Sequence, residues 1–224
     1  MTATKPYGNL DIAQLLVVGH DPWLQHGNTK ADYVFFMDYL EHEVPTVRSE
    51  KQKYGLAMSV VEYISHLTNG RYGLSNIHEV YFTNLCNNFL KRLERGTVYI
   101  PDEEANVGIA QIEKILEAAS IKAILPMSVQ VFYHLANKGF VPNESAEMRF
   151  FLDKAHPDGV STLKGAYVQT VPGAFLNVCG NVYYHQDIPV VPILHIKSWK
   201  RLGNREPYES RMTNAIQNIC RVLD

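Results

Sequence analysis

Short apolar runs alternate along the chain with longer segments in which apolar residues recur at helical spacing. The first run begins at Leu15, where four apolar residues are followed by glycine, polar residues and proline, up to Trp23. This order is typical of a strand that is buried on both faces and ends in a turn. Further strands are expected over 79–85, 121–126 and 190–196. The pattern predicts a three-layer α/β/α fold around a central, mostly parallel sheet of about four strands.

Helices are expected between these strands. The apolar spacing predicts them over 31–43, 54–67 and 145–154, and over two segments that begin at Pro101 and Ser128. Pro101 precedes three acidic residues, which suit the positive end of a helix dipole. Ser128 is a good N-cap, and Asn69-Gly70 is a good stop signal. A closing helix is expected after Pro207.

The pattern loosens between residues 143 and 185. Segments 167–171 and 175–184 read as irregular β structure, interrupted by Pro172-Gly173 and Gly180-Asn181. This region is too short to bury a core of its own. We therefore expect one domain over residues 1–224, with a β-rich insertion near the C-terminal third of the chain.

The net charge, the cysteines and the lengths of the apolar runs limit the classes of function expected for this protein. A net charge of -2 counts against a general DNA coat, so contact with nucleic acid would need a local basic patch. The most distinctive patch consists of Lys197, Ser198, Trp199, Lys200 and Arg201. The three cysteines form no C-x-x-C pair and are expected to be buried thiols in a reducing compartment. The chain shows neither a signal peptide nor an apolar run of about 20 residues, which predicts a cytoplasmic protein that does not enter a membrane.

Three polar residues fall at predicted strand ends. Asp21, Asn84 and His195 would lie along one edge of a parallel sheet, where ligands bind in this fold class. Asp21 and Asn84 also have ordinary interpretations: Asp21 can cap a turn, and asparagine favours turns. Phe35 and Phe36, soon after the first turn, could be core residues or could form the wall of a pocket.

The residues at these strand ends resemble motifs of the uracil-DNA glycosylase superfamily. Gly19-His20-Asp21-Pro22-Trp23 is similar to the family's Gly-Gln-Asp-Pro-Tyr motif, and Asn84 is similar to its base-reading asparagine. His195-Ile196-Lys197-Ser198 is a partial counterpart of its His-Pro-Ser motif. The sequence departs from the family at His20, Trp23 and Ile196. The bulkier Trp23 would narrow the pocket or block it.

The resemblance implies a hydrolase that removes a damaged pyrimidine, uracil first, after the nucleotide has been flipped out of DNA. Asp21 and His195 would be catalytic: Asp21 would activate water and stabilise the cationic sugar, and His195 would donate to the departing base. The residues His20, Trp23, Phe35, Phe36 and Asn84 would bind the substrate. Residues 197–201 would contact the phosphate backbone, with Trp199 as a wedge or stacking platform.

The partner expected from the resemblance is DNA containing a damaged or deaminated base, bound by a monomer. No cofactor or metal is expected, because the iron-sulfur branches of the superfamily need four cysteines and this chain has three. One alternative is a catalytically altered member that binds nucleic acid or a protein partner without releasing a base. A second is an unrelated α/β hydrolase or transferase that acts on a small nucleotide. The chain lacks both the Gly-x-Ser-x-Gly turn and the phosphate-cradling loop of such enzymes.

Overall fold

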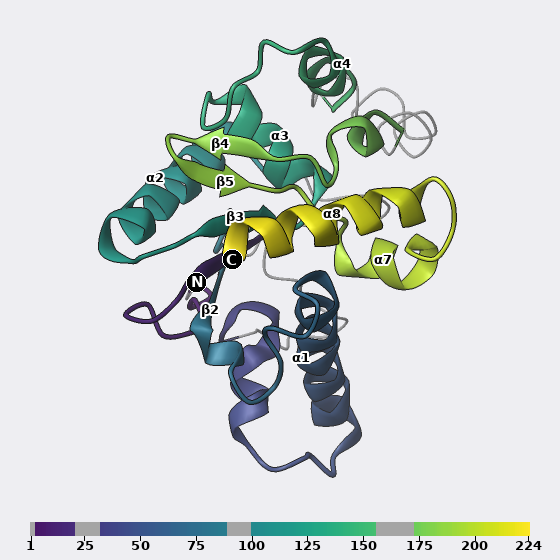
Figure 1. The fold of residues 1–224 in the computed structure, drawn as a ribbon. Helices are drawn as coiled ribbons and strands as arrows, with labels where there is room; N and C mark the ends of the chain where they lie inside the picture. Colours follow the sequence, from purple (N-terminus) through teal and green to yellow (C-terminus); the bar gives the residue numbers. More distant parts are fainter. Residues whose placement is uncertain (1–2, 21–31, 89–99, 156–172) are drawn as a thin grey trace.

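The computed structural model describes residues 3–20, 32–88, 100–155 and 173–224. Its elements follow the order of the chain from the first strand to the closing helix (Figure 1). They are β1 (Leu15–Gly19), η1 (Val34–Glu41), α1 (Arg48–Leu67), η2 (Ile77–Glu79), β2 (Val80–Asn84), α2 (Asp102–Ala118), β3 (Ala123–Pro126), α3 (Val129–Asn137), α4 (Ala146–Ala155), β4 (Tyr183–His185), β5 (Ile188–Val190), α7 (Ile196–Leu202) and α8 (Tyr208–Leu223).

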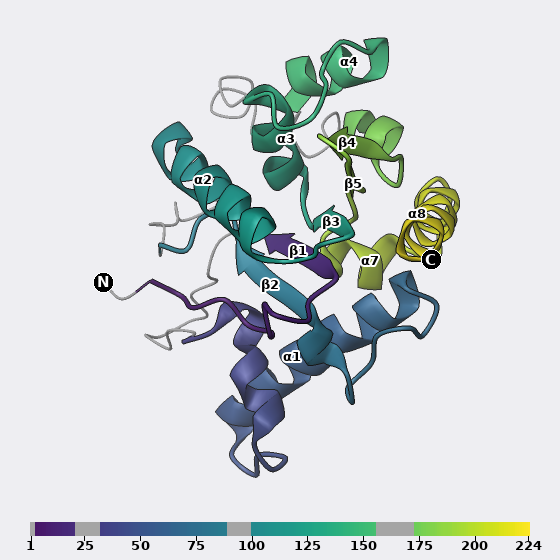
Figure 2. The ribbon, with the colours of Figure 1, turned by 60° about the vertical axis from the view of Figure 1, so that its left-hand side comes forward.

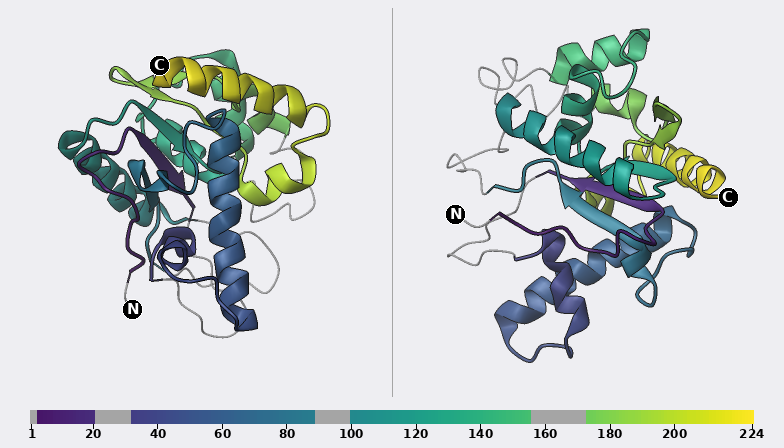
Figure 3. Two further views of the ribbon diagram at one scale, coloured as in Figure 1. Left: turned by 60° about the horizontal axis from the view of Figure 1, so that its bottom comes forward. Right: turned by 90° about the vertical axis from the view of Figure 1, so that its left-hand side faces the viewer.

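The five strands form one sheet in the order β2-β1-β3-β5-β4. Strand β1 pairs in parallel with β2 and β3, and β3 pairs in parallel with β5. Strand β4 is antiparallel to β5 at one edge. Helices α2 and α3 cover one face, and η1 and α1 lie on the other, with α7 and α8 beside α1 (Figures 2 and 3). The predicted α/β class and the mostly parallel sheet are confirmed.

Strand β1 lies inside the sheet, between β2 and β3. All five of its residues are buried, as its near-continuous apolar sequence predicts for a strand covered on both faces. The sheet continues beyond β5, because the N–H of Val191 donates to the carbonyl of Ile124 and the N–H of Ile193 to that of Pro126. The chain therefore runs beside β3 toward its carboxyl end and reaches that edge just before His195.

Several helices begin where the sequence predicts. Helix α2 begins directly after Pro101, and α8 begins directly after Pro207. The hydroxyl oxygen of Ser128 accepts a hydrogen bond from the N–H of Val131 at 3.1 Å, which is the expected N-cap of α3. The side chain of Ser145 caps α4 in the same way, through the N–H of Met148.

The segment predicted as an amphipathic helix over 31–43 differs from the prediction. It forms the 3-10 helix η1, which is interrupted by Phe35 (φ 55°) and Phe36 (φ 58°). Both residues adopt the left-handed backbone that costs roughly 1–2 kcal/mol for a residue other than glycine. Apolar spacing carries no signal for such a reversal, because it reports which side chains are buried and not the sign of φ.

The region expected to be irregular β structure also differs. Residues 173–178 are helical, and β structure begins only at Tyr183. Residues 167–171 lie outside the described part of the chain. Apolar runs of this length occur in buried helices as well as in strands, so their periodicity alone could not decide between the two.

Residues 4–9 lie along the outer edge of β2. Tyr7 and Phe82 exchange both backbone hydrogen bonds, at 3.0 and 2.8 Å, and the N–H of Thr4 donates to the carbonyl of Asn87. This segment occupies backbone groups that an edge strand would otherwise present to solvent.

Among the described residues, no helix combines the length and apolar character required to cross a membrane. The three cysteines are free thiols; Cys86 and Cys179 are buried, whereas Cys220 is partly exposed.

Candidate functional site

Gly19 and Asn84 end β1 and β2 side by side at the carboxyl edge of the sheet. They are partners in the parallel register, and the N–H of Leu85 donates to the carbonyl of Gly19 at 2.8 Å. A Cβ atom added to Gly19 would lie 2.4 Å from Oδ1 of Asn84 and 2.5 Å from Cζ of Phe35. Both side chains therefore converge over the glycine, where any larger residue would collide with them.

The ring of Phe35 reaches this position through the left-handed backbone of η1. It is half-buried and packs edge-on against Phe82 of β2, with ring centroids 6.1 Å apart. Strained backbone of this kind is concentrated at sites where geometry matters for function. Phe36 is only 4% exposed and packs against Tyr39, with Lys53 over its ring. Of the two phenylalanines, Phe35 is the one that lies over Gly19.

The carboxamide of Asn84 lies beside the Phe35 ring at the carboxyl end of β2. The side chain is 3% exposed, and no hydrogen bond joins its carboxamide to another described residue. A ligand that offered one donor and one acceptor would satisfy both ends of the amide.

His195 lies at the same edge, at the start of α7. Its Nδ1 accepts a hydrogen bond from the N–H of Lys197 at 3.2 Å, so the neutral ring carries its proton on Nε2. The chain just before it is held by α1, because the hydroxyl of Tyr63 donates to the carbonyl of Leu194 at 2.8 Å. The β5 extension lies two strand spacings from β1, or about 10 Å. His195 and the group over Gly19 thus share one sheet edge.

The other three residues of the first motif, Asp21, Pro22 and Trp23, lie outside the described residues. His20 is described, and it is half-buried rather than solvated. Its Nε2 lies 2.8 Å from Oε1 of Gln130 on α3. The same oxygen accepts the backbone N–H of Ile100 at 3.2 Å.

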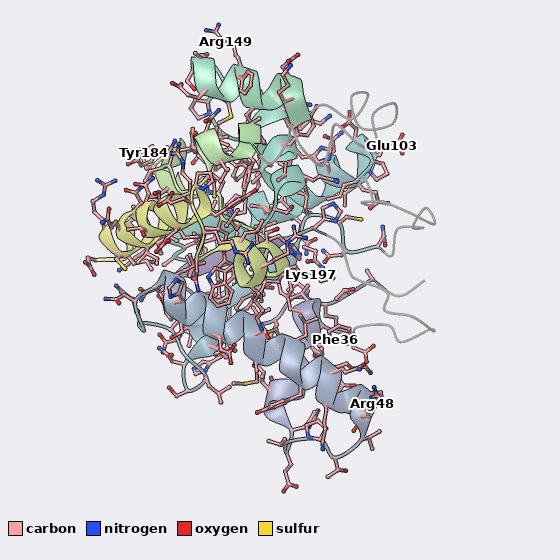
Figure 4. The ribbon with its side chains drawn as sticks, turned by 90° about the vertical axis from the view of Figure 1, so that its right-hand side faces the viewer. Phe36, Arg48, Glu103, Arg149, Tyr184 and Lys197 are labelled. Carbon is pink, nitrogen blue, oxygen red and sulfur yellow. The ribbon has the colours of Figure 1, made fainter. Side chains whose placement is uncertain are left out.

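The predicted phosphate-binding patch forms helix α7. Lys197, Lys200 and Arg201 are exposed, and Lys197 stands in the first turn (Figure 4). Trp199 stacks on Tyr63 of α1, with ring centroids 4.6 Å apart and planes at 23°. Because α1 covers one face of the indole, Trp199 presents less surface than the stacking platform expected from the sequence. Ser198 is half-buried, and Lys200 hydrogen-bonds to Ser59 of α1.

A second cluster of polar side chains, formed by His134, Asp102 and Lys138, lies one helical turn beyond Gln130. His134 is fully buried, and burial lowers its pKa to about 4, although the nearby carboxylate of Asp102 acts in the opposite direction. Asp102 Oδ1 lies 3.7 Å from Nδ1 of His134, and Asp102 Oδ2 lies 3.2 Å from Nζ of Lys138. These contacts of Asp102 connect the first turn of α2 with the C-terminal half of α3.

Sequence reasoning missed Gln130 and Tyr63. Gln130 lies among apolar neighbours in the run Val129 to Leu135, and a polar residue in such a run is a signal that could have been used. Tyr63 carries no comparable signal, because tyrosine is common in the core and its partner carbonyl lies 131 residues away.

Across the residues that the structure describes, no three or more His, Cys, Asp or Glu side chains are grouped to hold a metal ion. The chain matches no model of a known protein family. It also has no significant match among curated proteins.

Proposed function

We propose that this protein is a DNA glycosylase that hydrolyses the N-glycosidic bond of a flipped pyrimidine, most readily uracil. The observation that carries the proposal is the convergence of the Asn84 carboxamide and the Phe35 ring over Gly19 at the carboxyl edge of the sheet. A ring surface beside a carboxamide matches the two needs of a pyrimidine: a stacking partner and a hydrogen-bonding edge.

Uracil presents an N–H donor next to a carbonyl acceptor, and a carboxamide offers the complementary pair. In the proposed complex Asn84 donates to the carbonyl and accepts from the N–H, while Phe35 stacks on the base. A base that offers neither a donor nor an acceptor at this edge would leave the amide without these hydrogen bonds, so the site favours a polar base edge.

His195 is the proposed donor to the departing base. When the N-glycosidic bond breaks, electrons move onto the pyrimidine and negative charge grows on its oxygens. A fixed N–H aimed at that charge lowers the barrier. The hydrogen bond from Lys197 to Nδ1 supports this role, because it leaves the proton of the neutral imidazole on Nε2. The carboxylate of Asp21 is proposed to orient water and to stabilise the cationic sugar.

The exposed cations of α7 are proposed to hold the DNA backbone. Lys197, Lys200 and Arg201 follow His195 directly, so phosphates bound there would lie next to the base-releasing group. Such contacts give affinity that falls as salt rises.

The proposal is tested by incubating the protein with a single-stranded oligonucleotide that carries one uracil, followed by measurement of free uracil and of alkali-sensitive sites. The parent protein should release uracil. Asp21→Asn and Asn84→Leu should each abolish release, whereas Asn137→Leu, which changes an exposed asparagine at the far end of α3, should not.

Absence of uracil release by the parent protein, with Asp21→Asn behaving identically, would overturn the proposal. If the parent also bound the oligonucleotide in a salt-dependent way, the catalytically altered, nucleic-acid-binding alternative would take its place.

A further inference from the structure

Tyr63 joins helix α1 to the chain on both sides of His195. Its side chain is 0% exposed and lies in the C-terminal half of α1. Its hydroxyl donates to the carbonyl of Leu194, the residue before His195, at 2.8 Å. Its ring stacks on Trp199 of α7, with ring centroids 4.6 Å apart. One side chain of α1 therefore contacts both the segment that leads into His195 and the helix that follows it.

The hydroxyl of Tyr63 acts as a hydrogen-bond donor. Burial raises the pKa of Tyr63 well above its usual range, so the phenol keeps its proton at neutral pH. Two acceptors lie near this proton, the carbonyl of Leu194 at 2.8 Å and Sδ of Met212 at 3.8 Å. The carbonyl is the closer of the two and accepts more strongly than a thioether, so the proton points to Leu194.

Trp199 carries the contact with Tyr63 to the other side of His195. The backbone N–H of Trp199 donates to the carbonyl of His195 at 2.9 Å, where α7 begins. The indole lies against two residues of α1, because it stacks on Tyr63 and its centroid is 5.6 Å from that of the His66 ring. The packing of Trp199 on α1 therefore determines where the carbonyl of His195 lies.

The two peptide planes next to His195 determine the direction of its side chain. The carbonyl of Leu194 and the N–H of His195 belong to one rigid plane, and the carbonyl of His195 belongs to the next. Holding both planes holds His195 at φ -63° and ψ 141°, and with these angles the direction of its Cα–Cβ bond. The imidazole can then rotate only about the bonds of its own side chain, and the hydrogen bond from the N–H of Lys197 to Nδ1 restricts that rotation.

We propose that Tyr63 is a positioning residue that acts through His195: it fixes the backbone on both sides of this histidine, so that the imidazole is aimed at the departing base before the substrate binds. The proposal rests on the glycosylase function proposed above. The same contacts join His195 to α7, whose exposed cations are proposed to hold the DNA backbone. Tyr63 thereby also sets the distance between the base-releasing group and the bound phosphates.

Tyr63→Phe tests this role, because it removes the hydroxyl but keeps the ring that packs on Trp199. We expect kcat for uracil release to fall by about 10-fold with KM changed by less than about 2-fold, since the substrate still binds while the donor is misaligned. The matched control is Tyr72→Phe, which removes the hydroxyl of a tyrosine that is 2% exposed. Its neighbour Arg71 lies 3.5 Å from the side chain of Gln14, just before β1, so Tyr72 belongs to the opposite edge of the sheet. This control should leave both kinetic constants unchanged.

The leaving group separates the positioning of His195 from a general loss of structure. 5-Fluorouracil departs as a more stable anion than uracil, so its release depends less on a hydrogen-bond donor. From an oligonucleotide of the same sequence, we expect Tyr63→Phe to lower kcat for 5-fluorouracil release by only about 2-fold. Equal losses for the two bases would overturn the proposal, because the hydroxyl would then not act through His195.

Two NMR measurements need no activity. In the full-length parent protein, the hydroxyl proton of Tyr63 should give a slowly exchanging signal, because it is buried and hydrogen-bonded. A hydroxyl proton that exchanges too fast to be observed would overturn the proposal, and this result needs no variant to fold. The imidazole signals of His195 should shift in Tyr63→Phe and stay in place in Tyr72→Phe. His195 signals that are unchanged in Tyr63→Phe would also overturn the proposal.

The outcomes for the two proposals are distinguishable. An inactive parent in which Tyr63→Phe shifts the His195 signals would end the glycosylase function but leave the positioning of His195 intact. An active parent whose kcat is unchanged in Tyr63→Phe would end the positioning role and leave the glycosylase function standing.

Discussion

Two buried side-chain amides lie at the carboxyl edge of the same sheet, and they differ in what they bind. Gln130 is 4% exposed, and its oxygen faces two N–H groups of the protein. Asn84 is 3% exposed, and no hydrogen bond joins its carboxamide to another described residue. The two side chains are therefore equally buried but differ in their hydrogen bonds to the described part of the protein.

This difference separates stability from function at neighbouring positions. Removing a buried amide that hydrogen-bonds to the protein leaves its partners unsatisfied, whereas removing one without such bonds leaves no protein group unsatisfied. Residues around Gln130 should therefore respond to mutation mainly in the free energy of unfolding, and residues around Asn84 mainly in activity. The following experiments test this division.

The largest effect is expected at Gly19, beneath Asn84. In Gly19→Ala the new methyl group would meet Asn84 and Phe35 at 2.4 and 2.5 Å, so both side chains must shift. We expect uracil release to fall by about 100-fold, because displacements of this size disrupt alignment with the substrate. The measurement is kcat/KM on the single-uracil oligonucleotide.

The matched control is Gly55→Ala, since a Cβ atom at this exposed position of α1 meets nothing within 4 Å. It should leave activity unchanged and raise the free energy of unfolding by about 0.5–1 kcal/mol, as alanine is the better helix former. Equal activity of Gly19→Ala and Gly55→Ala would break the link between Gly19 and function.

His134, beside Gln130, should make stability depend on pH. Its pKa is lowered by burial from 6.5 to about 4, so the unfolded chain binds the proton more readily than the folded one. Its contribution is fully present above pH 6.5 and is lost as pH falls toward 4, by up to about 3 kcal/mol.

Urea unfolding at a series of pH values measures this effect. His134→Gln should flatten the slope between pH 6.5 and 4, and His42→Gln, at an exposed position, should leave it as in the parent. A slope that persists in His134→Gln would show that another group is responsible.

Gln130 and Asn84 can be compared directly through matched substitutions to leucine. Gln130→Leu leaves two N–H groups without their acceptor and should lower the free energy of unfolding by about 2–3 kcal/mol. Asn84→Leu removes no hydrogen bond to a described residue and should change it by less than about 1 kcal/mol, in either direction. Chemical denaturation of the two variants decides the matter, and similar losses would contradict the division proposed above.

The smallest effect is expected on α7. Lys197→Ala should weaken binding of the oligonucleotide by a few fold and lower the slope of log affinity against log salt by about 0.7, the value for one phosphate of a single strand. Fluorescence anisotropy at several salt concentrations measures both. Lys114→Ala on α2, across the sheet, is the control and should change neither (Figure 3).

The sequence predicts the strands and helices around the site better than it predicts the side-chain contacts within the site. The continuous apolar run of β1, the start of α2 after Pro101 and the Ser128 cap of α3 are local signals, and the structure agrees with them. The placement of Phe35 depends on a backbone reversal that apolar spacing does not encode. The pairing of His20 with Gln130 joins residues 110 positions apart, and only the folded sheet brings them together.

The segment 4–9 has a consequence for handling this protein. It occupies the outer edge of β2, the strand that ends in Asn84. Deleting it would uncover a row of backbone donors and acceptors that can template pairing with a second molecule. Purification tags and fusion partners therefore belong at the other end of the chain, and a shortened variant that elutes as larger species should be attributed to this uncovered strand.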